Sequence, residues 1–289
     1  MIYDNGELKA EKIIADKWMR LLYDDALGRA SLMRLASRKA VSRLYGLYCR
    51  TRHSARMIPG FIADNHVDMA GCAGAGQYKH FAAFFSREKK GISFPGAGRL
   101  LGSPCEGLVS AYADIDPDNM IAAKGAVYSL GELFGNAALA EKYRGGACLR
   151  VRLTPAHYHR MHFFDHGEIT DVRCIDGDLY SVNPLAVARV ARLYCQNKRV
   201  RVQIATRNFG EVVIVEVGAT FVGSIVHRFL VGDNARRGRQ ASYFLPGGSL
   251  VLVYFKEGAV ALDADILGRT AQGVETATKI GAVVGHNLT

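Results

Sequence analysis

The chain has 289 residues, of which 49% are hydrophobic, and a formal net charge of +10 at pH 7. This composition is sufficient for one large domain, or for one domain with an appendage. It argues against a membrane-spanning helix, because no apolar run approaches the roughly 18 residues that a span requires. The first residues have neither the basic nor the apolar region of a secretory signal. The basic excess favours an acidic partner, either nucleic acid or an anionic membrane.

The N-terminal segment is predicted to be helical over residues 7–50. Apolar residues recur there at spacings of three and four, with arginines between them. Residues 27–62 include no acidic residue but eight basic ones. Such a helix can pack on the core, present a solvated face or lie in a membrane interface. We expect packing together with some interfacial contact.

Strand-like alternation replaces the helical pattern further along the chain. A glycine-rich break at 71–76 precedes a short predicted helix at 78–86, and a stretch with Gly and Pro follows at 91–107. Neither GxGxxG nor GxxxxGK[ST] occurs, so a nucleotide-binding loop has little support. The clearest predicted strands are 147–153, 200–204 and 212–217.

These elements together predict an α+β fold, with N-terminal helices packed beside a β-rich body. We place an N-terminal helical, membrane-associating region at 1–65 and the β-rich body at 66–289.

Two segments carry residue types that suit catalysis. Residues 155–162 hold three histidines, which fit acid–base catalysis, scattered structural positions or a metal site. No second His or Cys cluster supplies further zinc ligands, and the six cysteines include no CxxC pair, so we expect no metal. In the second segment, Ser249 stands between two glycines and an apolar strand. A Gly-Gly pair before a strand ordinarily only forms a turn, so this serine gains meaning beside the other segments.

These segments and several others, in the same order, resemble the phosphatidylserine decarboxylase family over almost the whole chain. Several ordered motifs at suitable separations are more specific than any one of them. The stretches that resemble the family's FFxR, SPxDG, YHRxH, VGAxxVGSI and GS patterns, and three further stretches, are Phe84–Arg87, Ser103–Gly107, Tyr158–His162, Val217–Ile225, Gly248–Ser249, Tyr180–Pro184, Asn197–Arg199 and Gly273–Gly281.

The resemblance implies a cofactor that the chain makes from itself. The Ser249 hydroxyl would attack the carbonyl of Gly248. Elimination would then separate a β chain (1–248) from an α chain (249–289) whose first residue becomes a pyruvoyl group. That group would form a Schiff base with the substrate's amine and withdraw electrons as CO₂ leaves.

By the same resemblance, His162 is the base for Ser249, and an acidic residue of the SPxDG segment orients this histidine. Glu106 occupies that position and is one methylene longer than the family's aspartate. A glutamate can still orient an imidazole. His159 would bind the substrate or assist proton transfer, and we assign no role to His157.

The implied substrate is phosphatidylserine. The implied partners are an anionic phospholipid membrane and the protein's own two chains, with no nucleic acid. We expect a peripheral protein on the cytoplasmic side of the membrane. The sequence leaves a homodimer as one possible oligomeric state. Two alternatives are left: a pyruvoyl-dependent decarboxylase of free aromatic amino acids, whose processing motifs would look the same, and a non-enzymatic module that binds through its basic N-terminal region.

Overall fold

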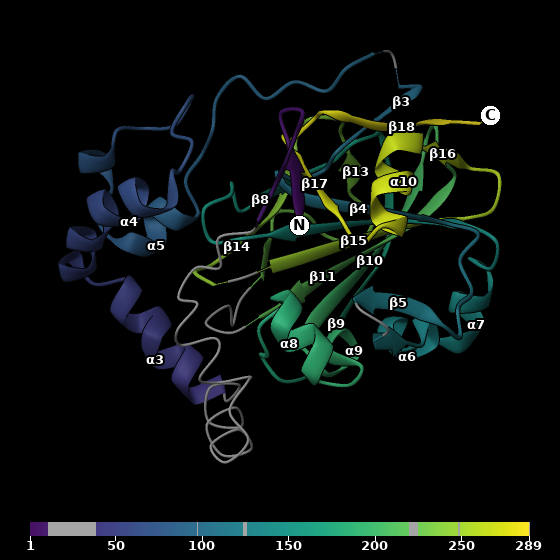
Figure 1. Cartoon of the computed structure of the whole chain (residues 1–289), viewed down its shortest axis with the longest axis horizontal. Helices are drawn as coiled ribbons and strands as arrows, with labels where there is room; N and C mark the ends of the chain where they lie inside the picture. Colours follow the sequence, from purple (N-terminus) through teal and green to yellow (C-terminus); the bar gives the residue numbers. More distant parts are fainter. Residues whose placement is uncertain (11–38, 97, 124–125, 220–224, 248, 289) are drawn as a thin grey trace.

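A ten-stranded sheet forms the centre of the protein (Figure 1). The computed structural model describes residues 1–10, 39–96, 98–123, 126–219, 225–247 and 249–288. Every neighbouring pair of strands in the sheet is antiparallel except β1 and β17, which are parallel. In sheet order the strands are β13 (Asn234–Ala235), β9 (Gly167–Ile175), β10 (Arg199–Thr206), β11 (Glu211–Gly218), β15 (Ser249–Phe255), β7 (Ala147–Leu153), β4 (Gly107–Ala113), β17 (Glu275–Thr278), β1 (Ile2–Asp4) and β2 (Glu7–Lys9).

Strand β15 lies in the middle of this sheet, between β11 and β7. All of its side chains are buried, and successive side chains of a strand point to opposite faces. Alternate residues from Val251 to Phe255 join one hydrophobic core, and those from Leu250 to Tyr254 join a second core on the other face. The continuous apolar run is therefore explained by burial of the strand on both faces.

Other elements cover each face of the large sheet. The face that carries Leu250 packs against four short helices and the β5–β6 hairpin. The opposite face packs against two three-stranded sheets, with the orders β12-β14-β8 and β16-β18-β3, and against α10. The elements on the Leu250 face are β5 (Met120–Ala123), β6 (Ala126–Tyr128), α6 (Leu130–Phe134), α7 (Ala137–Glu141), α8 (Pro184–Arg189) and α9 (Leu193–Gln196). Those on the opposite face are β3 (Leu100–Gly102), β8 (Arg160–His162), β12 (Ile225–His227), β14 (Gln240–Phe244), β16 (Val260–Leu262), α10 (Ala264–Ala271) and β18 (Val283–Asn287).

The N-terminal helices form a separate hydrophobic cluster at one side of the sheets, next to β14 and β8 in Figure 1. Its centre is aromatic: the ring of Phe61 lies 5.2 Å from Phe81 and 5.9 Å from Phe84, both edge to face. Among the described residues, no helix combines the length and hydropathy needed to cross a bilayer. The helices here are α3 (Lys39–Cys49), η1 (Arg52–Met57), α4 (Ile58–Asn65), η2 (Ala75–Gln77) and α5 (Phe81–Phe85).

The structure confirms the α+β class, with N-terminal helices beside a β-rich body. The three clearest predicted strands are found as β7, β10 and β11, and the predicted helix at 78–86 is found as α5. The predicted helix at 7–50 is wrong at its start, because residues 7–9 form β2 in a hairpin with β1. Residues 11–38 of that prediction lie outside the described part of the chain, whereas α3 is helical as expected.

The boundary between an N-terminal region and the β-rich body at residue 65 stays a prediction. Contacts cross it in both directions: β1 pairs with β17 of the body, and α5, which follows residue 65, packs with the N-terminal helices.

Candidate active site

Ser249 is the first residue of β15 and is fully buried. It pairs with Gly218 at the end of β11 on one side and with Leu153 at the end of β7 on the other. Because Gly218 has no side chain, the serine has no side-chain neighbour directly opposite it on β11. Gly247 has a φ of 144°, which glycine adopts without steric cost. Gly248, the other residue of the expected cleavage site, lies outside the described residues.

The ring of His159 faces this serine. Its Nδ1 lies 3.5 Å from the Ser249 Oγ, and its Nε2 lies 3.0 Å from the carbonyl oxygen of Thr154. A carbonyl only accepts hydrogen bonds, so Nε2 carries the proton and Nδ1 is left as the acceptor that faces the hydroxyl. The ring also stacks on Phe85, with centroids 4.0 Å apart.

His159 is neutral in this environment. Burial lowers its pKa well below the ordinary value, and the positive charge of Arg87 and the neighbouring His157 lower it further. A neutral imidazole with a free Nδ1 can accept a proton from a serine hydroxyl. The arrangement can therefore activate Ser249 as a nucleophile.

His162 does not make the contact that the sequence predicted. Its Nδ1 lies 2.9 Å from the carbonyl of Gly238, and its Nε2 lies 3.1 Å from the hydroxyl of Tyr158. Both ring nitrogens are therefore occupied, and neither is bonded to Ser249. The reason is the spacing: His159 and His162 are three residues apart in extended backbone, and an odd separation places side chains on opposite faces.

Glu106 is not hydrogen-bonded to His162 either. Its Oε1 accepts a hydrogen bond from the backbone N–H of Tyr158 at 3.4 Å, and its Oε2 lies 3.6 Å from the Nζ of Lys89. The two predicted segments do meet, because the backbone N–H of His162 donates to the carbonyl of Pro104 at 2.9 Å. Glu106 thus helps to fix the turn before β8, and a direct Glu106–His162–Ser249 chain is absent from the described structure.

The FFxR segment holds the backbone that precedes His159. Arg87 is 2% exposed, and its guanidinium donates from Nη2 to the carbonyls of Ala156 and His157, at 3.1 and 3.2 Å. Arg160 in turn donates from Nε to the carbonyl of Arg87 at 3.0 Å. These hydrogen bonds join the segment around Arg87 to the segment that carries His159, about 70 residues further along the chain.

A carboxylate–histidine pair that the sequence analysis missed lies on the same face of the sheet as Ser249. Glu216 is fully buried on β11, and its Oε2 lies 2.5 Å from the Nε2 of His227. Its Oε1 accepts a hydrogen bond from the hydroxyl of Ser242. Burial lowers the pKa of His227, but the Glu216 carboxylate outweighs it and the pKa is raised overall. The only signal in the sequence is a single acidic residue inside the apolar run 212–217.

The register places this pair close to the serine. Glu216 lies opposite Val251, and Gly218 lies opposite Ser249. Diagonal neighbours on adjacent strands are about 7–8 Å apart. The Glu216 carboxylate is therefore a neighbour of the site, although the structure shows no hydrogen bond between it and Ser249.

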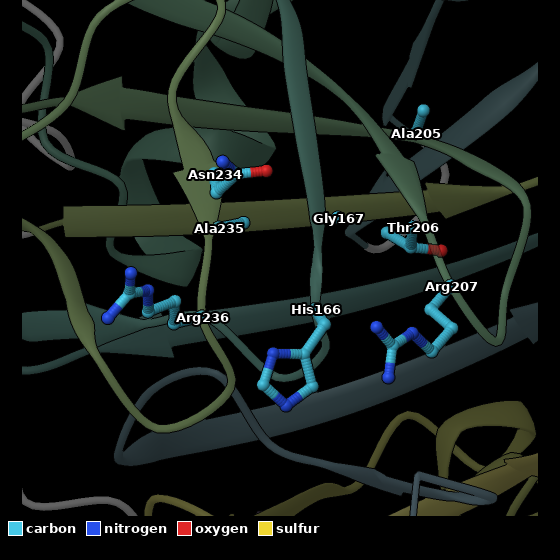
Figure 2. A pocket seen from close by; sticks show the side chains of 8 residues that line it. All are labelled: His166, Gly167, Ala205, Thr206, Arg207, Asn234, Ala235 and Arg236. Carbon is cyan, nitrogen blue, oxygen red and sulfur yellow. The ribbon is translucent and has the colours of Figure 1, made fainter.

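A separate polar pocket of about 420 Å³ lies at the other end of β10 (Figure 2). In this view the ring of His166 lies between the side chains of Arg207 and Arg236. Strand β10 begins beside Val217, near Ser249, and ends at the pocket with Thr206. The length of the strand separates the pocket from the serine, so it is not part of this site. In the described ranges, no group of three or more His, Cys, Asp or Glu side chains could hold a metal ion.

A buried serine that faces a neutral histidine, at the start of a strand preceded by a Gly-Gly pair, defines an enzyme site with a nucleophilic serine. Comparisons with known proteins give the family. A family model described as phosphatidylserine decarboxylase matches residues 78–282. The chain belongs to this family, and it is a decarboxylase.

Curated relatives agree over nearly the full length of the chain. The phosphatidylserine decarboxylase proenzyme of Ruminiclostridium cellulolyticum is 37% identical over 279 residues, which cover 96% of this chain and 93% of the relative. The proenzyme of Clostridium novyi is 37% identical and covers 96% and 95%, and that of Clostridium perfringens is 36% identical with the same coverage.

Proposed function

We propose that the chain is a proenzyme that cuts itself between Gly248 and Ser249 and then decarboxylates phosphatidylserine. The observation that carries this proposal is the 3.5 Å contact between the Ser249 Oγ and the Nδ1 of a neutral His159. The family membership and the word "proenzyme" in the names of the relatives support it.

The cleavage begins with His159, which accepts the hydroxyl proton of Ser249 through Nδ1. The Oγ attacks the carbonyl carbon of Gly248, and the peptide bond is replaced by an ester. Elimination across the Cα–Cβ bond of residue 249 then releases the upstream chain as a carboxylate. Addition of water and loss of ammonia leave a pyruvoyl group at the new N-terminus.

The residues around Ser249 fit such a group. The neighbouring position on β11 is Gly218, which adds no side chain next to the new terminus, and the serine is buried away from bulk water. When formed, the pyruvoyl group supplies a carbonyl that reacts with an amine and accepts electrons as CO₂ departs. His159, with its Nε2 proton held by Thr154, is placed to move a proton at the same centre.

The substrate arrives from a membrane in this proposal. Helix α3 exposes Leu44, Leu47 and Tyr48, whose exposed fractions are 68%, 55% and 41%. Spacings of three and four place these side chains on one face of the helix. An exposed apolar face followed by Arg50, Arg52 and Arg56 suits an anionic bilayer surface. The cytoplasmic location and a homodimeric state stay predictions from the sequence.

The substrate is tested by measuring CO₂ release by the purified, self-cleaved protein. We expect release from phosphatidylserine in mixed micelles and none from free tyrosine, phenylalanine or tryptophan. Release from a free aromatic amino acid, with none from the lipid, would replace the lipid substrate with the alternative. A protein that releases CO₂ from neither would contradict the proposed activity.

A further inference from the structure

Within the described part of the chain, no carboxylate pairs with the buried side chain of Arg87. Its Nη2 donates to two backbone carbonyls, whereas the N–H groups of Nε and Nη1 have no hydrogen-bond partner. The face of the Phe84 ring, 5.2 Å from the guanidinium carbon, supplies a weak counterpart. A buried charge that is not paired costs several kcal/mol, so retention of an unpaired arginine at this position calls for an explanation.

Three other basic side chains in this part of the fold pair with carboxylates. Lys89 pairs with Asp68 and Glu106, at 3.0 and 3.6 Å. Arg160 pairs with Glu88 at 3.1 Å.

Arg152, whose charge lowers the pKa of His157, pairs with Glu275 at 2.5 Å. Among these described cations, Arg87 is therefore the one whose charge is not balanced by an acidic side chain.

We propose that Arg87 binds the phosphodiester of the substrate's headgroup. This subsite rests on the proposed function, because it assumes a phospholipid that reacts at residue 249. Arg87 anchors the carbonyl of His157, two residues before the histidine that touches Ser249. A guanidinium suits this anion because its donors match two phosphate oxygens at once.

The phosphodiester is a better partner than the carboxylate. The carboxylate loses its charge as CO₂ leaves, so an ion pair with it would stabilise the bound substrate more than the transition state and slow the reaction. The phosphodiester keeps its charge throughout the reaction. Pairing with it supplies affinity without a penalty in the chemical step.

The subsite opens when the chain is cut. In the uncut chain the Nε and Nη1 groups are shielded from solvent. The backbone N–H of Phe244 donates to the carbonyl of His159 at 3.0 Å, so the segment before the cleavage site is attached to the histidine two residues after the His157 carbonyl that Arg87 binds. Cleavage after Gly248 makes the segment after Phe244 a chain end, and in this proposal that end must leave the His159 segment so that the headgroup can enter.

The test compares two inhibitors of the self-cleaved enzyme with phosphatidylserine as substrate. Glycerophosphoethanolamine has the amine and the phosphodiester but no carboxylate, and ethanolamine has the amine alone. The wild type should be inhibited more strongly by glycerophosphoethanolamine. Arg87→Gln should raise both the KM for the lipid and the inhibition constant of glycerophosphoethanolamine by about 10- to 100-fold, because hydrogen bonds to a charged group are lost. Ethanolamine inhibition should stay close to wild type, whereas kcat should fall because Arg87 also holds the backbone before His159, so the two inhibition constants decide the test.

Arg237→Gln is the matched control. This guanidinium also donates to two carbonyls, those of Pro95 and Leu100, and also has unpartnered Nε and Nη1 groups. Its partners are not in the His159 segment, so both inhibition constants should remain at wild-type values.

Several results would overturn the subsite. If Arg87→Gln raises the KM for the lipid but not the inhibition constant of glycerophosphoethanolamine, the arginine binds the carboxylate instead. If neither value changes, it binds no part of the substrate. If Arg87→Gln fails to self-cleave, the wild type and Arg87→Lys are compared instead. Equal inhibition of the wild type by the two compounds contradicts the subsite. Stronger inhibition of the wild type by glycerophosphoethanolamine, together with weaker inhibition of Arg87→Lys by the same compound, supports it. A wild type that is cut but inactive on the lipid would instead overturn the proposed function, and the subsite with it.

Discussion

His159 reaches Ser249 through the ring nitrogen that carries no proton, and His162 does not reach it at all. The two histidines belong to one motif and are identical in chemistry. Their different contacts follow from the alternation of side chains along an extended backbone, which turns one ring toward the large sheet and the other toward Tyr158.

Substitution of the two histidines separates their roles. His159→Ala should slow self-cleavage by about 10²- to 10⁴-fold, which is the usual contribution of a general base. His162→Ala should be cut at close to the wild-type rate, although loss of its bonds to Tyr158 and Gly238 should lower stability. Cleavage is followed as a time course on denaturing gels, with circular dichroism as a check of folding. Normal cleavage of His159→Ala together with uncut His162→Ala would restore the assignment that the sequence suggested.

The pH dependence of cleavage should reflect a neutral His159. Because burial holds its pKa well below 6.5, the base stays unprotonated as the pH falls from 7.5 through 6.5. The cleavage rate of the folded protein should therefore be nearly constant over this range. A rate that falls with a midpoint near the ordinary histidine pKa of about 6.5 would show that the base is a solvated histidine.

The stability of the fold, unlike the cleavage rate, should depend on pH in this range. His157 has a pKa lowered to about 4, by burial first and then by Arg152 and Arg87, and the pKa of His159 is lowered as well. The unfolded chain binds protons at these residues below about pH 6.5, and the folded chain does not. Free energy of unfolding should therefore decrease as the pH falls below 6.5, and chemical denaturation at several pH values measures this decrease.

At the scale of elements, strand β11 carries two carboxylates in contrasting environments. Glu216 is fully buried between His227 and Ser242, whereas Glu211 pairs with Lys256 at the exposed end of the strand.

Glu216→Ala should cost about 3–5 kcal/mol of unfolding free energy, because it leaves buried partners unpaired. Glu211→Ala should cost at most about 1 kcal/mol, as is usual for an exposed pair. Urea denaturation of both variants tests this difference, and equal costs would mean that the buried pair does not contribute to stability.

Helix α3 is expected to contact lipid through its apolar face. A double change of Leu44 and Leu47 to Ser should weaken sedimentation with anionic vesicles, since burial of one leucine side chain contributes about 1.5–3 kcal/mol. Added salt should weaken it further. Self-cleavage should continue, because neither side chain is part of the Ser249 site. If this variant sediments with vesicles as well as the wild type does, α3 is not part of the membrane contact.

Some elements could be predicted from the sequence because their signal is local. Apolar residues that alternate with polar ones indicated β7 and β10, a β-branched run indicated β11, and the Gly-Gly-Ser sequence indicated the start of β15. The strand β1 could not be predicted, because three residues carry little pattern and the partner, β17, lies at the far end of the chain. The contact between Ser249 and His159 depends on the packing of β8 beside the large sheet, which no local pattern encodes.

At the scale of the whole molecule, the segment that cleavage would release as the α chain (249–289) contributes strands to the central sheet. β15 lies between β11 and β7, and β17 lies between β4 and β1, so each of these two strands from after the cleavage site pairs on both sides with strands from before it. The second half of the site is thus held by backbone hydrogen bonds that do not depend on the peptide bond after Gly248. The two chains should elute together in gel filtration after cleavage and separate only in denaturant.

Intact mass spectrometry of the purified protein tests the central claim, self-cleavage at Ser249, most directly. We predict two masses under denaturing conditions, one for residues 1–248 and one for residues 249–289 with a pyruvoyl group in place of the serine. Ser249→Ala should give one mass near 31.5 kDa. A wild-type protein that retains this single unmodified mass after prolonged incubation would contradict the claim.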